Sequence, residues 1–200
     1  IPNPIYMDLP MKNFIDNGDT EKIILNVGRL SPQKAQDILI KAFAKTDNNG
    51  WKLIIAGEGE DRSKLEGLIN ELGIQHKIEL AGRIKNISDM YSRAKIFAFS
   101  SQFEGFPNAL IEAMYFGLPC ISTDCPTGPS ELISNGENGF LVPMNDVDSM
   151  ADKLGILMND MDKCKLFGER AQKTVEIFKV KNVIKQWKRI IDECLNTTTQ

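Results

Sequence analysis

The sequence has few of the residues that bind metals or form cross-links. It contains one histidine, His76, and four cysteines, at positions 120, 125, 164 and 194, with no CxxC pair among them. This spacing excludes the usual Cys/His metal set. It favours four reduced thiols in a cytoplasmic protein, with Cys120 in a buried strand.

Long apolar runs and excess positive charge are also missing. No stretch approaches the ~20 apolar residues that a membrane span needs, and we find no signal peptide. The net charge of −3 argues against a general nucleic-acid binder. With 42% hydrophobic residues in 200, the chain can bury the core of one domain.

Short apolar runs alternate with amphipathic segments along most of the chain. The runs are rich in Ile, Leu, Val and Phe, which is typical of strands covered on both faces of a parallel sheet. They lie at 22–30, 52–57, 77–82, 96–101, 119–124 and 139–143. Helical patterns lie between them, at 33–45, 61–73, 87–94, 108–117 and 129–136.

This alternation predicts a doubly wound α/β fold with a parallel sheet of about six strands. Residues 146–195 add two or three C-terminal helices. Their candidate apolar anchors are Leu154, Leu157, Phe167, Ile177, Val183, Trp187 and Ile191.

Right-handed crossovers place the loops that follow the strands at one edge of the sheet, where ligands bind. The cations expected there are Arg29, Lys34 and Arg83, and the carboxylates are Glu104, Glu112 and Glu131. Arginine and lysine together suit a diphosphate, and the helix starting near Asn108 presents free N–H groups to an anion. Gly105 lets the backbone approach closely.

Glu104 and Glu112 lie on either side of this helix start. Carboxylates do not bind phosphate but accept hydrogen bonds from sugar hydroxyls. The pattern therefore suits a molecule with a sugar on each side of a diphosphate. Simpler explanations stay open: Arg29 and Lys34 as solvated charges, Arg83 as a loop cap, and Glu131 as a first-turn acid.

Other motifs favour structural roles. Gly57-Glu58-Gly59 is part of the glycine-rich motif of dinucleotide-binding folds, but its acidic residues would repel a pyrophosphate. We therefore interpret it as a turn. Asp146-Val147-Asp148 and Asp160-Met161-Asp162 resemble an Asp-x-Asp metal motif but lie at helix starts, where capping explains them. We therefore predict no bound metal. The excess of Lys and Arg over residues 162–193 indicates a basic helix face exposed to solvent; contact with anionic lipid is the alternative.

The stretch "EGFPNALIEA" resembles the Glu-x7-Glu signature of retaining glycosyltransferases of family 4, which have the GT-B fold. Five further segments match in the family's order: "VGRLSPQKAQDILIKAF", "LIIAGEGEDRSKLE", "IELAGRIKNISDMYSRAKIFAFSSQ", "GLPCISTDCPTGPSELI" and "NGENGFLVP". The resemblance covers about residues 1–180. It implies the Rossmann-like, donor-binding C-terminal half of a GT-B enzyme.

The resemblance also implies residue roles. Arg29 and Lys34, beside Gly28, would hold the donor diphosphate, and Arg83 and Ile84 would lie near the nucleobase. Glu104 would contact the transferred sugar, and Glu112 the ribose. Backbone amides of the loop and helix start would face sugar and phosphate; these belong to Gly105, Phe106, Pro107, Asn108, Ala109 and Leu110, although Pro107 itself carries no N–H. The loop Thr127-Gly128-Pro129-Ser130-Glu131 departs from the family's paired glycines, which puts the role of Glu131 in doubt.

The resemblance divides the chain into a linker over 1–20, a donor-binding domain over 21–195 and a frayed tail over 196–200. The expected donor is a nucleotide-diphosphate sugar, with UDP favoured over GDP. The acceptor would bind mainly an N-terminal domain that this chain lacks, in an enzyme that is cytoplasmic or peripheral at the inner face of the membrane. Alternatives are a non-catalytic nucleotide-sugar module and a GT-B-fold epimerase.

Overall fold

The computed structural model describes Pro4 and residues 21–197. The expected linker, apart from Pro4, and the last three residues of the expected tail lie outside the described residues. The strands are β1 (Lys22–Val27), β2 (Trp51–Ala56), β3 (Ile78–Gly82), β4 (Ile96–Phe99), β5 (Cys120–Thr123) and β6 (Gly139–Val142). The helices are α1 (Gln36–Lys45), α2 (Arg62–Glu71), α3 (Ile87–Arg93), α4 (Asn108–Tyr115), α5 (Pro129–Leu132), α6 (Val147–Asn159), α7 (Met161–Thr174), the 3-10 helix η1 (Val175–Phe178) and α8 (Val180–Thr197).

The six strands form one parallel sheet in the order β3-β2-β1-β4-β5-β6. This is the Rossmann order, and the predicted fold class is confirmed. The strand order reverses between β1 and β4, where Ile24 pairs with Ile96 and Leu25 with Phe97. In folds of this kind ligands bind outside the carboxyl ends of the strands at that reversal.

Alternating side chains of the strands enter two separate cores, one on each face of the sheet. Ile24 lies in the core covered by α1, α2 and α6, whereas Ile23 and Leu25 lie in the core covered by α3, α4 and α5. All three side chains are completely buried. Burial on both faces explains why the strands are continuous apolar runs rather than alternating ones.

Two helix boundaries bear on the site. α4 ends at Tyr115, just before Gly117, where the predicted helix 108–117 ended; the φ of +73° at Gly117 is the left-handed conformation typical of helix C-termini. α1 begins at Gln36, three residues later than predicted, because Ala35 has a left-handed φ of 45° that interrupts the helical path. Lys34 therefore lies in a turn between β1 and α1, not inside the helix.

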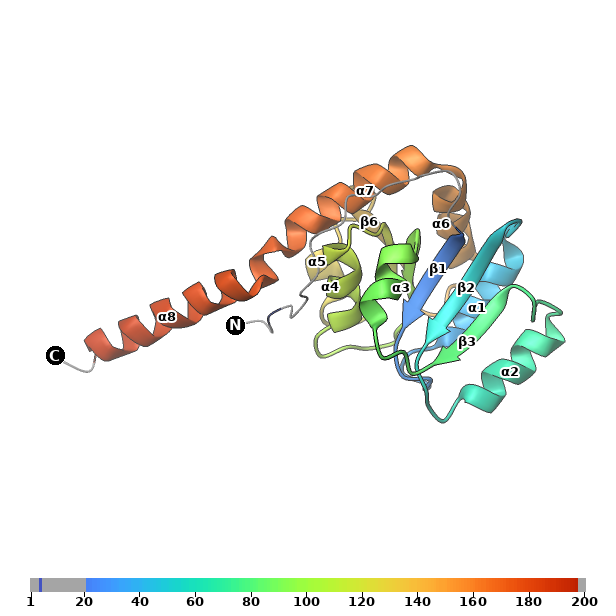
Figure 1. Ribbon diagram of the computed structural model, residues 1–200, viewed down its shortest axis with the longest axis horizontal. Helices are drawn as coiled ribbons and strands as arrows, with labels where there is room; N and C mark the ends of the chain where they lie inside the picture. Colours follow the sequence, from blue (N-terminus) through green and yellow to red (C-terminus); the bar gives the residue numbers. More distant parts are fainter. Residues whose placement is uncertain (1–3, 5–20, 198–200) are drawn as a thin grey trace.

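The C-terminal helices confirm part of the predicted packing and correct the rest. Leu154, Leu157, Phe167 and Val183 are buried as expected. The other three expected anchors are exposed: Ile177 by 53%, Trp187 by 52% and Ile191 by 53%. Trp187 and Ile191 are exposed because they lie on α8, which extends away from the α/β body (Figure 1). Ile177 lies in η1, before that helix begins.

Candidate functional site

The loops after β1 and β2 interlock at the carboxyl edge of the sheet. Gly28 N–H donates to Ala56 O over 3.0 Å, and Leu30 N–H donates to Glu58 O over 3.1 Å. A Cβ at Gly57 would lie 1.9 Å from Gly28 O, and one at Gly59 would lie 2.1 Å from Leu30 O. These glycines serve the close approach of two loops, in agreement with the interpretation of this segment as a turn.

A cavity of about 460 Å³ opens between the ends of β1, β2 and β3. It is lined by Val27, Gly28, Arg29, Ala56, Gly57, Glu58, Arg83, Ile84 and Ile87. The structure thus brings together four of the predicted site residues, two from the β1 loop and two from the β3 loop. The Arg29 side chain is 75% exposed and its Nε lies 4.0 Å from Glu60, so the guanidinium can turn toward an anion.

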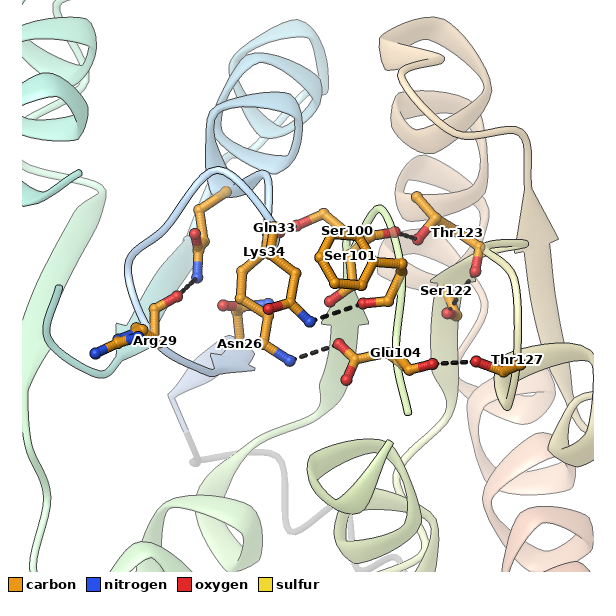
Figure 2. Close-up of polar contacts among 12 residues, drawn as sticks. Asn26, Arg29, Gln33, Lys34, Ser100, Ser101, Glu104, Ser122, Thr123 and Thr127 are labelled. Carbon is orange, nitrogen blue, oxygen red and sulfur yellow. Dashed lines mark hydrogen bonds and ion pairs between the residues drawn. The ribbon is translucent and has the colours of Figure 1, made fainter. Parts of the chain in front are cut away.

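Lys34 and Glu104 form an ion pair across the strand reversal (Figure 2). Lys34 Nζ lies 2.5 Å from Glu104 Oε1, and the two side chains are only 19% and 7% exposed. The ammonium also lies 5.2 Å from the centre of the Phe99 ring. The ammonium and the carboxylate are therefore held together where little water reaches them, so solvent and salt screen their attraction only weakly.

Hydrogen bonds fix the two loops that carry this pair (Figure 2). Ser100 Oγ donates to Lys34 O over 2.8 Å. Gln102 N–H donates to Gln33 O over 2.8 Å. On the other side, the Thr127 hydroxyl donates to Glu104 O. The ion pair is consequently braced from both the β1 loop and the β5 loop. The contacts of these bracing residues could not be predicted from the sequence, because they span 23 to 69 positions and leave no local pattern.

The α4 start lies directly after the Glu104 loop. Pro107 is its N-cap residue and makes no side-chain cap bond. Asn108 N–H donates to Phe106 O and Leu110 N–H donates to Pro107 O, so two of the amides expected to face the donor are engaged within the turn. A second cavity of about 320 Å³ joins this start to α5, with Gly105, Phe106, Pro107, Gly128 and Glu131 among its lining residues.

Glu112 lies one turn into α4 and is half-buried. Its Oε2 accepts a 2.8 Å hydrogen bond from the Tyr91 hydroxyl. Burial raises the pKa of the Glu112 carboxyl, and the Tyr91 hydrogen bond partly lowers it again. Tyr91 was not predicted as a site residue, since an aromatic on a short helix before a strand is typical of a core position.

The first aspartate of each acidic pair caps a helix, and the second lies in the first turn of that helix. Asp146 Oδ1 accepts from Ser149 N–H over 2.9 Å, and Asp160 Oδ1 accepts from Lys163 N–H over 2.8 Å. Within residues 21–197, no three His, Cys, Asp or Glu side chains are grouped so as to hold a metal ion. The expectation of a metal-free site stays a prediction. In the same part of the chain, no helix has the length and apolar character to span a membrane.

A family model described as glycosyl transferases group 1 matches residues 11–174. The chain belongs to this family. Curated relatives of the group 1 chain include a Streptomyces coelicolor exopolysaccharide phosphotransferase, 38% identical over 88% of the chain and 19% of that protein. Another is the Campylobacter jejuni GalNAc-α-(1→4)-GalNAc-α-(1→3)-diNAcBac-PP-undecaprenol α-1,4-N-acetyl-D-galactosaminyltransferase, 32% identical over 92% of the chain and 52% of the relative.

Solved structures agree with the fold of this group 1 chain. A Staphylococcus aureus TarM mutant in complex with UDP superposes with a TM-score of 0.81 and 28% identity, covering 90% of the chain and 37% of TarM. The lipopolysaccharide outer core galactosyltransferase WaaB superposes with a TM-score of 0.79 and 30% identity, covering 96% of the chain and 54% of WaaB. The group 1 chain thus spans about half or less of these relatives. The roles of its individual residues stay predictions.

Proposed function

We propose that the chain is the donor-binding half of a retaining glycosyltransferase that uses a nucleotide-diphosphate sugar. The observation that carries this proposal is the buried Lys34–Glu104 pair, 2.5 Å apart, between the arginine-lined cavity and the start of α4. A diphosphate next to Lys34 and a sugar next to Glu104 would satisfy both charges. Arg83 and Ile84, at the far side of the cavity, would contact the base.

In the proposed reaction, the bond between the anomeric carbon and the diphosphate oxygen breaks. The acceptor oxygen bonds to the same carbon from the same face, and its proton passes to the departing phosphate oxygen. Arg29, Lys34 and the positive end of α4 stabilise the charge that builds on the diphosphate, a role that a metal ion performs elsewhere. Glu104 orients the transferred sugar through its hydroxyls.

No protein nucleophile is required by this scheme. Burial raises the pKa of the Cys120 and Cys125 thiols, so both stay protonated near neutral pH and are poor nucleophiles. His76 lies at the amino end of β3, on the edge of the sheet opposite the site, so it offers no acid or base to the sugar. This placement argues against the epimerase alternative.

We favour a UDP-sugar over a GDP-sugar as the donor. The supporting observations are the solved relatives in complex with UDP, TarM at 28% identity and the pneumococcal O-GlcNAc transferase GtfA at 26%. Product analysis with the full-length enzyme tests the function. A transferred sugar with retained anomeric configuration is expected; an epimerised donor, a transferred sugar phosphate or no reaction would contradict the proposal.

The acceptor part of the proposal rests on two observations. The chain spans 52% of its Campylobacter relative, and α8 carries an exposed apolar stripe formed by Ile184, Trp187, Ile190 and Ile191. We propose that an acceptor-binding domain of the full-length protein covers this stripe. The alternative is the membrane surface, to which Lys181, Lys185, Lys188 and Arg189 would add electrostatic attraction.

Charge introduced into the stripe separates these two cases. Trp187→Asp is expected to lower the thermal unfolding midpoint of the full-length protein by several degrees, because a buried unpaired carboxylate is costly there. The same substitution is expected to leave the 200-residue chain unchanged, since Trp187 is 52% exposed. Equal midpoints in the full-length protein, together with lost binding to phosphatidylglycerol vesicles, would point to the membrane instead.

A further inference from the structure

Tyr91 occupies an unusual place for a phenol. Its side chain is completely buried, and its ring is stacked on Phe116 at 5.4 Å and tilted against Phe97 at 6.0 Å. Packing of this kind would suit a phenylalanine equally well. What distinguishes the tyrosine is its hydroxyl, which reaches from α3 to α4 and needs a partner when buried.

That partner is the Glu112 carboxylate. The Tyr91 hydroxyl lies 2.8 Å from Glu112 Oε2 and 3.3 Å from Ala109 O. A phenol has one hydrogen to donate, and an ionised carboxylate is the stronger acceptor. The bond engages one carboxylate oxygen, and a carboxylate can accept several hydrogen bonds, so Glu112 keeps capacity to accept from a ligand.

We propose that Tyr91 is a positioning residue that holds the Glu112 carboxylate in the orientation needed to accept hydrogen bonds from the ribose hydroxyls of the donor. The proposal rests on the function given above. Glutamate has three rotatable side-chain bonds, so an unanchored carboxylate would lose rotamer freedom on binding the ribose. Because the clamped ring of Tyr91 cannot move, its hydroxyl fixes the carboxylate before the donor arrives.

The charge state of the pair agrees with this geometry. Burial and the neighbouring Glu112 raise the pKa of Tyr91 well above its usual value, so the hydroxyl remains a donor. The Tyr91 hydrogen bond opposes the burial that raises the pKa of Glu112. The Cys120 thiol of β5, which faces Tyr91, is kept protonated by its own burial and adds no charge near neutral pH.

The test is Tyr91→Phe in the 200-residue chain, with Tyr115→Phe, which removes a phenol hydroxyl from the helix that carries Glu112, as the control. Calorimetry would compare UDP with 2′,3′-dideoxyuridine diphosphate. Tyr91→Phe is expected to weaken UDP binding about tenfold, the size of one hydrogen bond to a charged group. It should not weaken binding of the dideoxy compound, which has no ribose hydroxyl, and in a Glu112→Ala background it should have little further effect.

The pH profile provides a second readout. Affinity for UDP is expected to fall as pH drops through the pKa of Glu112, because a protonated carboxyl cannot accept from both hydroxyls. Without the Tyr91 hydroxyl that pKa rises, so the fall should begin at higher pH in Tyr91→Phe than in the parent chain.

Each outcome separates this inference from the function on which it rests. If Glu112→Ala weakens UDP binding and Tyr91→Phe does not, the positioning role is wrong and the donor site stands. Equal losses with UDP and the dideoxy compound would show that Tyr91 matters only for packing. If UDP binds no form of the chain, the proposed function itself fails.

Discussion

Lys34→Met is expected to lower the free energy of unfolding by about 3–5 kcal/mol, because it leaves the Glu104 carboxylate buried and unpaired. In the full-length enzyme, the same change should reduce turnover by about 10²–10³-fold, as the loss of one group that stabilises transition-state charge does elsewhere. Chemical denaturation of the 200-residue chain measures the first effect. Steady-state kinetics of the full-length enzyme measures the second.

Two matched variants control this experiment. Lys45→Met breaks a pair of the same 2.5 Å length with Asp148, but the two side chains are 55% and 80% exposed, so the loss should stay below about 1 kcal/mol. Adding Glu104→Gln to Lys34→Met removes the unpaired charge and should restore much of the stability without restoring turnover. Equal small losses for the two lysines would contradict the account of a buried pair.

Glu112→Ala is expected to raise the KM for the donor by about 10²-fold or more, with a smaller change in kcat. Each ribose hydroxyl bound to a charged acceptor contributes about 1.5–3 kcal/mol, and two such bonds are proposed. The contribution is made in the ground state and the transition state alike, which is why it appears mainly in KM. Initial-rate kinetics of the full-length enzyme over a range of donor concentrations measures it.

Glu71→Ala, which removes an exposed carboxylate at the end of α2, provides the control and should leave both constants unchanged. Glu104→Ala should show the reverse pattern, with the loss mainly in kcat. If Glu112→Ala left KM unchanged, Glu112 would not bind the ribose, and the assignment of the two glutamates to the two sugars would be lost.

Much of the fold could be predicted from sequence because the interactions that define it are local or repetitive. A strand buried on both faces must be apolar throughout, so Ile23, Ile24 and Leu25 marked β1 without knowledge of their partners. The helix predicted over 108–117 ended at Gly117, close to the observed end of α4 at Tyr115. Because the loops after parallel strands lie at one edge of the sheet, Arg29, Arg83 and Glu104 could be placed at the same edge without any contact information.

The direct contacts within the site could not be predicted in the same way. Lys34 and Glu104 are 70 positions apart, and Tyr91 and Glu112 are 21 apart. The sequence assigned Lys34 and Glu104 separately to phosphate and sugar, whereas the structure pairs them with each other. A bound diphosphate must therefore either share the Lys34 ammonium with the Glu104 carboxylate or displace that carboxylate from Lys34.

The exposed stripe on α8 shows a different limit. The sequence marked Val183, Trp187 and Ile191 as apolar anchors at helical spacing, which predicts a buried face; Ile184 was not among them. An apolar period predicts that one face of a helix is buried, but it does not identify the surface that buries it. Val183 is covered by the domain itself, whereas Trp187 and Ile191 are 52% and 53% exposed.

The central claim is that this chain holds a nucleotide-diphosphate sugar at the carboxyl edge of its sheet. Isothermal titration of the 200-residue chain with UDP, UDP-sugars and GDP tests it most directly. The expected result is saturable one-to-one binding of UDP and at least one UDP-sugar, weakened by Glu112→Ala. Absence of binding heat with every uridine and guanosine nucleotide would contradict the claim.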